Sequence, residues 1–154
     1  MVHSAPMTSA PVAVVDALNS LLESQQNSII RFMGEGSPYL TRATAEVRRP
    51  LQEMLNNNLR RCSELYTAIE ALGGEPRPRT VQPEEQYLAY LSLKFLLPKL
   101  VDAKKLVIRR YENALKAIGK GPAEAVALLQ RHLADHRAEL AILEKAAASV
   151  IAAK

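Results

Sequence analysis

The sequence has no tryptophan, five tyrosines and two phenylalanines, so aliphatic side chains must fill most of its interior. It has a single cysteine, Cys62, which excludes an internal disulfide and fits a reducing compartment, and we therefore expect a cytoplasmic protein. No run of about 18 uninterrupted apolar residues occurs, so we expect no membrane span. The first residues lack a basic start followed by a long apolar run, and they predict no signal peptide.

A strong excess of one charge is also missing. The chain has 20 basic and 16 acidic residues, for a net charge of +4. Its three Arg-Arg pairs, at 48–49, 60–61 and 109–110, are spread along the chain and alternate with acidic residues. Nucleic-acid binding would favour one concentrated basic stripe with aromatic side chains for stacking, so we expect no nucleic-acid partner.

The sequence is rich in aliphatic residues spaced three or four apart, which is the pattern of amphipathic helices. A length of 154 residues suits one domain. We expect residues 1–10 to form a disordered tail and residues 11–154 to form one all-α domain. Four helices are predicted, over residues 12–33, 40–72, 83–118 and 123–152.

Glycine and proline mark the ends of these helices. Residues 34–38 and 119–122 predict short turns, and Gly73 with Gly74 predicts the end of the second helix. Proline removes a backbone hydrogen bond, so Pro50 predicts a kink or a break in the first part of the second helix, and Pro98 predicts a kink in the third. The proline-rich residues 73–83 predict a long crossover between those helices.

Each of the four apolar stripes is interrupted near its middle by one polar residue. Two further polar residues, Arg61 and Glu139, follow three positions after such an interruption and therefore face the same way on their helices. If the helices lie side by side, these residues form one polar layer inside an apolar core. The layer comprises Gln25, Asn58, Arg61, Lys104, His136 and Glu139.

Three segments resemble the ligand-bearing helices of the ferritin-like family, which includes bacterioferritins and rubrerythrins. They are LNSLLESQQNSIIRF, NNNLRRCSELYTAIEALGGEP and HLADHRAELAILE, and the resemblance covers about residues 12–152. It implies a ferritin-like four-helix bundle with a long crossover between the second and third helices, and a homodimer. In that family two helices each supply one Glu and the other two each supply Glu-x-x-His to a di-iron centre.

Position by position, the resemblance implies that none of the six ligands is kept. The two single Glu positions hold Gln25 and Lys104. One Glu-x-x-His becomes Asn58 with Arg61, and the other becomes His136 with Glu139, in reversed order. Lys104 and Arg61 would repel a metal ion in a poorly screened interior. We therefore expect no di-iron centre, no cofactor and no ferroxidase activity.

A salt-bridged network is expected in place of the metal. Glu139 is the natural partner of Lys104 or Arg61, because unpaired buried charges are costly. Gln25, Asn58 and His136 would complete the hydrogen bonding, and Arg61 could extend to the surface along its stem. This predicts a catalytically inactive, structural or interaction protein whose protein partner the sequence does not identify.

Two alternatives remain open. His132 and His136 are four residues apart on one helix and could share a metal with Glu139 and Asp135, which would give an iron-binding ferroxidase or storage protein with a rearranged site. The charges of Lys104 and Arg61 would instead suit a small anionic ligand. Away from the layer, the carboxylates of Glu23, Glu64, Asp102 and Asp135 are predicted to be solvated, and of Asn56–Asn58 only Asn58 is predicted to point inward.

Overall fold

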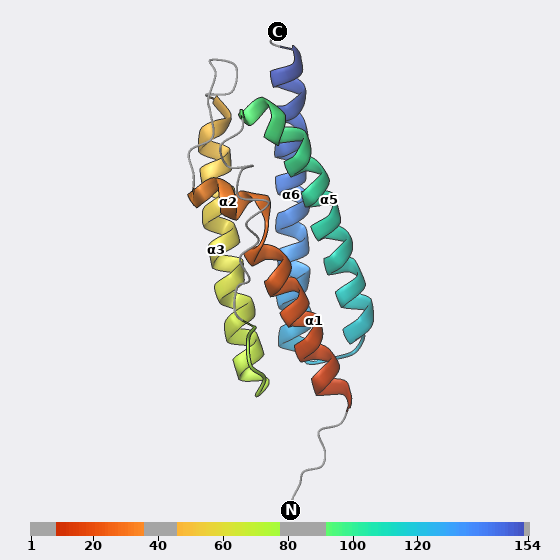
Figure 1. Ribbon diagram of the computed structural model, residues 1–154. Helices are drawn as coiled ribbons and strands as arrows, with labels where there is room; N and C mark the ends of the chain where they lie inside the picture. The colour runs from red at the N-terminus through yellow and green to blue at the C-terminus, as the bar shows by residue number, and fades with distance from the viewer. Residues whose placement is uncertain (1–8, 36–45, 78–91, 153–154) are drawn as a thin grey trace, which may run out of the picture.

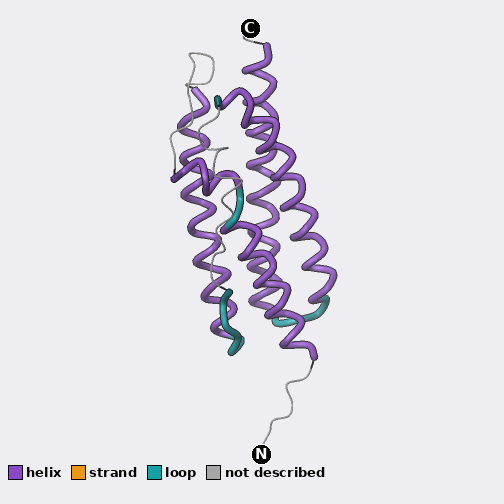
Figure 2. Tube along the Cα trace, in the orientation of Figure 1, coloured by secondary structure: helices purple, strands orange, loops and turns teal. Residues whose placement is uncertain are grey.

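The computed structural model describes residues 9–35, 46–77 and 92–152 (Figure 1). The secondary-structure elements of these ranges are α1 (Ser9–Gln26), α2 (Ile29–Glu35), α3 (Arg48–Ala71), α5 (Leu93–Ile118) and α6 (Ala123–Ala152). The described part of the chain is therefore all-α, as predicted, with loops joining the helices (Figure 2). Most of the predicted tail lies outside the described residues, but α1 already begins at Ser9.

The four longer helices, α1, α3, α5 and α6, lie alongside one another, and the short α2 packs mainly against α3 (Figure 1). The closest pairing joins α5 and α6 through the turn that follows Gly119. In Figure 1, α3 and α5 run in the same direction, so the end of α3 and the start of α5 lie at opposite ends of the molecule. The predicted crossover over residues 73–83 is described only as far as Arg77.

The first predicted helix is broken in two, so the prediction of one helix over residues 12–33 was wrong. Helix α1 ends at Gln26 and α2 begins at Ile29. Between them the Ser28 hydroxyl donates to the Gln25 carbonyl at 2.8 Å, and the Asn27 amide donates to the Glu23 carbonyl at 3.1 Å. Such side-chain bonds compete with the helical ladder and favour a break.

Pro50 lies in the first turn of α3, which begins at Arg48, so it marks the start of this helix and does not kink it. Proline is tolerated in a first turn because the amide it lacks would have no partner within the helix. Residues 40–45 of the predicted helix lie outside the described residues. Pro98 lies inside α5, whose first turns are inclined to the rest of the helix in Figure 1.

The predicted range can be compared with the structure in part for α5 and in full for α6. Helix α5 begins at Leu93, where the Ser92 hydroxyl accepts a hydrogen bond from the Lys94 amide at 3.3 Å as an N-cap. Residues 83–91 of that prediction lie outside the described residues. Helix α6 spans Ala123–Ala152, which confirms the predicted range of 123–152.

The core consists of two apolar clusters, one on each side of the polar layer. On α3, α5 and α6 the buried apolar residues stop near the layer and resume beyond it. One cluster includes Leu18, Leu22, Leu65, Ile69, Ile108 and Leu129, and the other includes Leu51, Met54, Leu97, Leu100, Leu143 and Val150. The polar residues are therefore enclosed by apolar packing from both ends.

Helix α3 ends as predicted, at a glycine pair. Gly73 has a φ of 81°, a conformation that favours glycine. Its amide donates to the Glu70 carbonyl, and the Gly74 amide donates to the Ile69 carbonyl, both at 3.0 Å. This pair of bonds is the Schellman motif that closes many helices.

Replacing Gly74 by alanine is expected to destabilise the protein by about 1–3 kcal/mol, through overpacking. A Cβ there would lie 2.6 Å from Cγ1 of Val15 and 3.2 Å from Cγ2 of Ile69. Urea unfolding measures the loss. In a Val15→Ala background the cost of Gly74→Ala should fall to about 1 kcal/mol or less, since contacting residues are coupled. An equal cost in both backgrounds would show that this close approach is not its cause.

Candidate functional site

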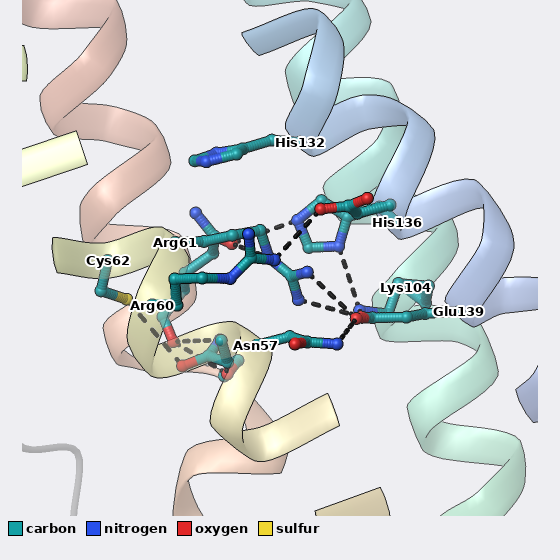
Figure 3. A network of polar contacts seen from close by, with 12 residues as sticks. Asn57, Arg60, Arg61, Cys62, Lys104, His132, His136 and Glu139 are labelled. Carbon is teal, nitrogen blue, oxygen red and sulfur yellow. Dashed lines mark hydrogen bonds and ion pairs between the residues drawn. The ribbon is translucent and has the colours of Figure 1, made fainter. Parts of the chain in front are cut away.

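The six residues of the predicted layer meet between the two apolar clusters. Gln25 comes from α1 and Asn58 from α3. Arg61 comes from α3, Lys104 from α5, and His136 and Glu139 from α6 (Figure 3). Five of them are buried, and the Lys104 side chain is 12% exposed. The packing of the helices thus brings together side chains that are far apart in sequence. Gln25 and Glu139, which are 114 residues apart, both contact Arg61.

Glu139 is the centre of the charged part of the layer. Arg61 binds it with both terminal nitrogens, Nη1 to Oε2 at 3.0 Å and Nη2 to Oε1 at 2.9 Å. Lys104 Nζ lies 2.7 Å from Oε1, and Asn57 Nδ2 donates to Oε2 at 3.1 Å. The predicted pairing is present with both cations at once.

Two details differ from prediction here. The Arg61 side chain is only 1% exposed and does not reach the surface, because its guanidinium is held by Glu139 and Gln25. Asn57 also points inward, onto Glu139, although Asn58 alone was predicted to do so. Asn58 itself donates to the Gln25 carbonyl at 3.3 Å and to the Ser28 hydroxyl at 3.4 Å, at the break between α1 and α2.

Gln25 joins the charged part to a second, neutral branch. Its Oε1 accepts from Arg61 Nε at 3.3 Å and faces His136 Nε2 at 3.1 Å, while its Nε2 donates to the Tyr111 hydroxyl at 2.8 Å. Because the amide oxygen can only accept, we assign a proton to His136 Nε2. His136 Nδ1 then accepts from Lys104 Nζ at 3.0 Å, so the ring is neutral.

The neutral branch continues through Tyr111 to a second histidine. The Tyr111 hydroxyl, which accepts from Gln25, donates to His132 Nδ1 at 2.9 Å. His132 Nε2 then donates to Glu64 Oε1, also at 2.9 Å. The Glu64 side chain is 35% exposed, so this chain of hydrogen bonds ends at the surface. In this chain of hydrogen bonds each donor faces an acceptor when both histidines are neutral.

Tyr111 and Glu64 are therefore members of the network that sequence reasoning missed. Tyr111 continues the apolar stripe of its helix, so its spacing gives no polar signal. Glu64 is partly exposed, as predicted, but its carboxylate also contacts His132. Glu64 lies three residues after Arg61, the same spacing that connects Arg61 to Asn58, and that spacing was the available signal. Asp135, by contrast, pairs with Arg60 at 3.2 Å on the surface, where its side chain is 43% exposed.

Burial and neighbouring charges fix the protonation states. Burial lowers the pKa of His136 strongly, and the nearby charges of Lys104 and Arg61 act in the same direction. Burial also lowers the pKa of His132, against the opposing effect of Glu64. Burial raises the pKa of the Tyr111 hydroxyl. These groups are consequently neutral near pH 7.

The charged groups behave differently. Burial acts to raise the pKa of Glu139, but the hydrogen bonds and charges of Arg61 and Lys104 outweigh it, so that pKa lies below its ordinary value. Burial lowers the pKa of Lys104 although Glu139 opposes the change. The layer around Glu139 therefore combines two cations with one carboxylate.

These residues do not fit a di-iron centre. Two iron ions need several carboxylate and imidazole ligands, but both oxygens of Glu139 already accept from Arg61, Lys104 and Asn57. His136 Nδ1 faces the ammonium group of Lys104. Within residues 9–35, 46–77 and 92–152, no group of three or more His, Cys, Asp or Glu side chains is arranged to hold a metal ion.

The alternative metal set of His132, His136 and Glu139 is also dispersed. His132 directs its ring nitrogens to Tyr111 and Glu64, while the nitrogens of His136 face Gln25 and Lys104. Cys62 is buried beside Asn58. The arrangement can hold charge and connect four helices, but it offers no open metal ligands.

The fold and site thus define an all-α protein with a buried network of ion pairs and hydrogen bonds. The chain belongs to the family described as Domain of unknown function (DUF6306), whose profile matches residues 12–146. Neither the curated proteins nor the solved structures gave a match. Among the helices that the structure describes, none combines the length and apolarity needed to cross a bilayer.

Proposed function

We propose that this protein is a ferritin-like four-helix bundle in which a buried network of side-chain ion pairs takes the place of a di-iron centre. It serves as a structural or interaction module, without ferroxidase activity, and forms a homodimer. The observation that carries the proposal is the position of Arg61 and Lys104. Both cations contact one buried carboxylate, Glu139, at positions where the family resemblance places metal ligands.

The arrangement of the helices supports the bundle. Ferritin-like folds are four-helix bundles with one long crossover connection. Here four long helices lie together, and the parallel directions of α3 and α5 separate the ends that the crossover must join (Figure 1). The broken first helix departs from a regular bundle, since α1 ends at Gln26, one residue after the layer.

The charges support the loss of metal binding. A dication approaching the layer would meet Arg61, which cannot lose its proton, and Lys104. Both are screened poorly in the protein interior. Metal binding would also require Glu139 to give up its bonds to both cations, which would leave them unpaired in the core.

The protein purified from cells grown in iron-rich medium is expected to contain no stoichiometric iron. Elemental analysis measures the metal, and oxidation of added ferrous ion measures ferroxidase activity. About two irons per chain would instead support a ferritin-like iron protein with a rearranged site, and would refute the proposal. The Arg61→Glu, Lys104→Glu double variant is a useful comparison, because it replaces both cations by potential metal ligands.

A further inference from the structure

A small cavity borders the polar layer on the side of the second apolar cluster. Its volume is about 40 Å³, and its polar lining comes from Gln25, Ser28, Asn58, Lys104 and His136. Its apolar lining comes from Ile29, Ile30, Met54, Leu100, Ala103, Val107 and Leu143. A single water needs only about 10–15 Å³, so the cavity has room for a ligand of a few non-hydrogen atoms.

Lys104 has an unused donor at this cavity. Its ammonium group carries three N–H bonds. One is directed to His136 Nδ1 at 3.0 Å and one to Glu139 Oε1 at 2.7 Å. No third acceptor contacts Nζ among the residues that the structure describes. A ligand in the cavity can therefore accept a hydrogen bond without displacing either partner.

The local charge favours an anion. Arg61 and Lys104 supply two positive charges and Glu139 supplies one negative charge, which leaves an excess of one positive charge. Glu64 is separated from this group by Tyr111 and His132. Glu139 is not part of the cavity lining, so a carboxylate bound to Lys104 would not contact it.

A surface groove adjoins this cavity. The groove, of about 530 Å³, lies between α5 and the junction of α1 with α2. It shares four lining residues with the cavity: Ser28, Ile29, Ala103 and Val107. The groove and the cavity therefore have one wall in common, beside the break after Gln26.

We propose that this cavity binds a short-chain carboxylate such as acetate or propionate. The carboxylate accepts from Lys104 Nζ, and the aliphatic part lies between Met54, Leu100 and Leu143. The size of the cavity limits the chain length, and the apolar lining favours an aliphatic body over an inorganic anion. This binding is additional to the proposed structural role and does not depend on it.

Titration of methyl-labelled protein with propionate, followed by NMR, tests the proposal. We expect saturable shifts of the Leu100, Val107 and Leu143 methyl groups, with dissociation constants in about the millimolar range that so few ligand atoms allow. Propionamide has the same shape without the charge and should bind about tenfold or more weakly. Phosphate and chloride at equal ionic strength should not saturate the same signals.

Three variants locate the site. Lys104→Met should abolish propionate binding, whereas Lys105→Met, the same change at an exposed neighbour, should leave it intact. Ala103→Leu fills the shared wall without touching the charges and should also abolish binding, which keeps the test decisive if Lys104→Met does not fold. Non-saturating shifts, equal binding of propionamide, or binding retained in Ala103→Leu would each overturn the proposal.

Discussion

Replacing Glu139 by glutamine is expected to lower the free energy of unfolding by about 3–5 kcal/mol. The substitution keeps the shape of the side chain but removes the carboxylate that contacts both Arg61 and Lys104. Lys104 can respond by losing its proton, but the Arg61 guanidinium cannot, and it stays charged in the core. The cost comes from this unpaired charge, and urea unfolding at neutral pH measures it.

Glu112→Gln is the matched control for this substitution. Glu112 also joins α5 to α6, through a 2.9 Å contact with Arg137, but both side chains are about half exposed. An exposed pair contributes at most about 1 kcal/mol. If Glu139→Gln costs no more than Glu112→Gln, then Glu139 is not the counter-charge that holds the buried cations.

Acidification is expected to destabilise the protein well before its carboxylates titrate. The pKa of His136 is lowered from an ordinary value of 6.5, so below pH 6.5 the unfolded chain binds a proton that the folded chain excludes. Stability is therefore complete above pH 6.5 and falls below it. The fall is about 1.4 kcal/mol per pH unit, or about 2 kcal/mol by pH 5. His132, whose pKa is also lowered, adds to it in the same direction.

Glu139 extends this acid sensitivity to lower pH. Its pKa is lowered from an ordinary 4.5, so the stability it contributes is present above pH 4.5 and is lost as the pH falls toward its value in the folded protein. Unfolding measured at intervals from pH 7.5 to about pH 4.5 gives the slope. The slope of the unfolding free energy against pH gives the number of protons taken up on unfolding. His136→Gln should reduce that number by about one between pH 6.5 and 5. An unchanged slope would show that His136 is not the residue that takes up the proton on unfolding.

The helices themselves were well predicted wherever apolar periodicity extended over many turns. Helix α6 has a stripe that extends over most of its length and no internal glycine or proline, and its predicted range is confirmed. The α1–α2 break was missed because the stripe continues across it through Ile29. The competing hydrogen bonds of Asn27 and Ser28 are local side-chain effects that apolar spacing does not report.

The charged half of the network could be predicted, because a polar residue that interrupts an apolar stripe is conspicuous. The neutral half could not. Tyr111 fits an apolar stripe, and only its hydroxyl reveals its polar role once Gln25 and His132 lie beside it. The complete burial of Arg61 also depended on context, since its bidentate bond to Glu139 requires α3 and α6 at a specific separation.

The most direct test of the central claim is a crystal structure of the protein grown with ferrous salt, with anomalous data collected at the iron absorption edge. We expect Arg61 and Lys104 both to be bound to Glu139, with no anomalous peak among these side chains. An ordered iron between His136 and Glu139, with Lys104 displaced toward solvent, would contradict it.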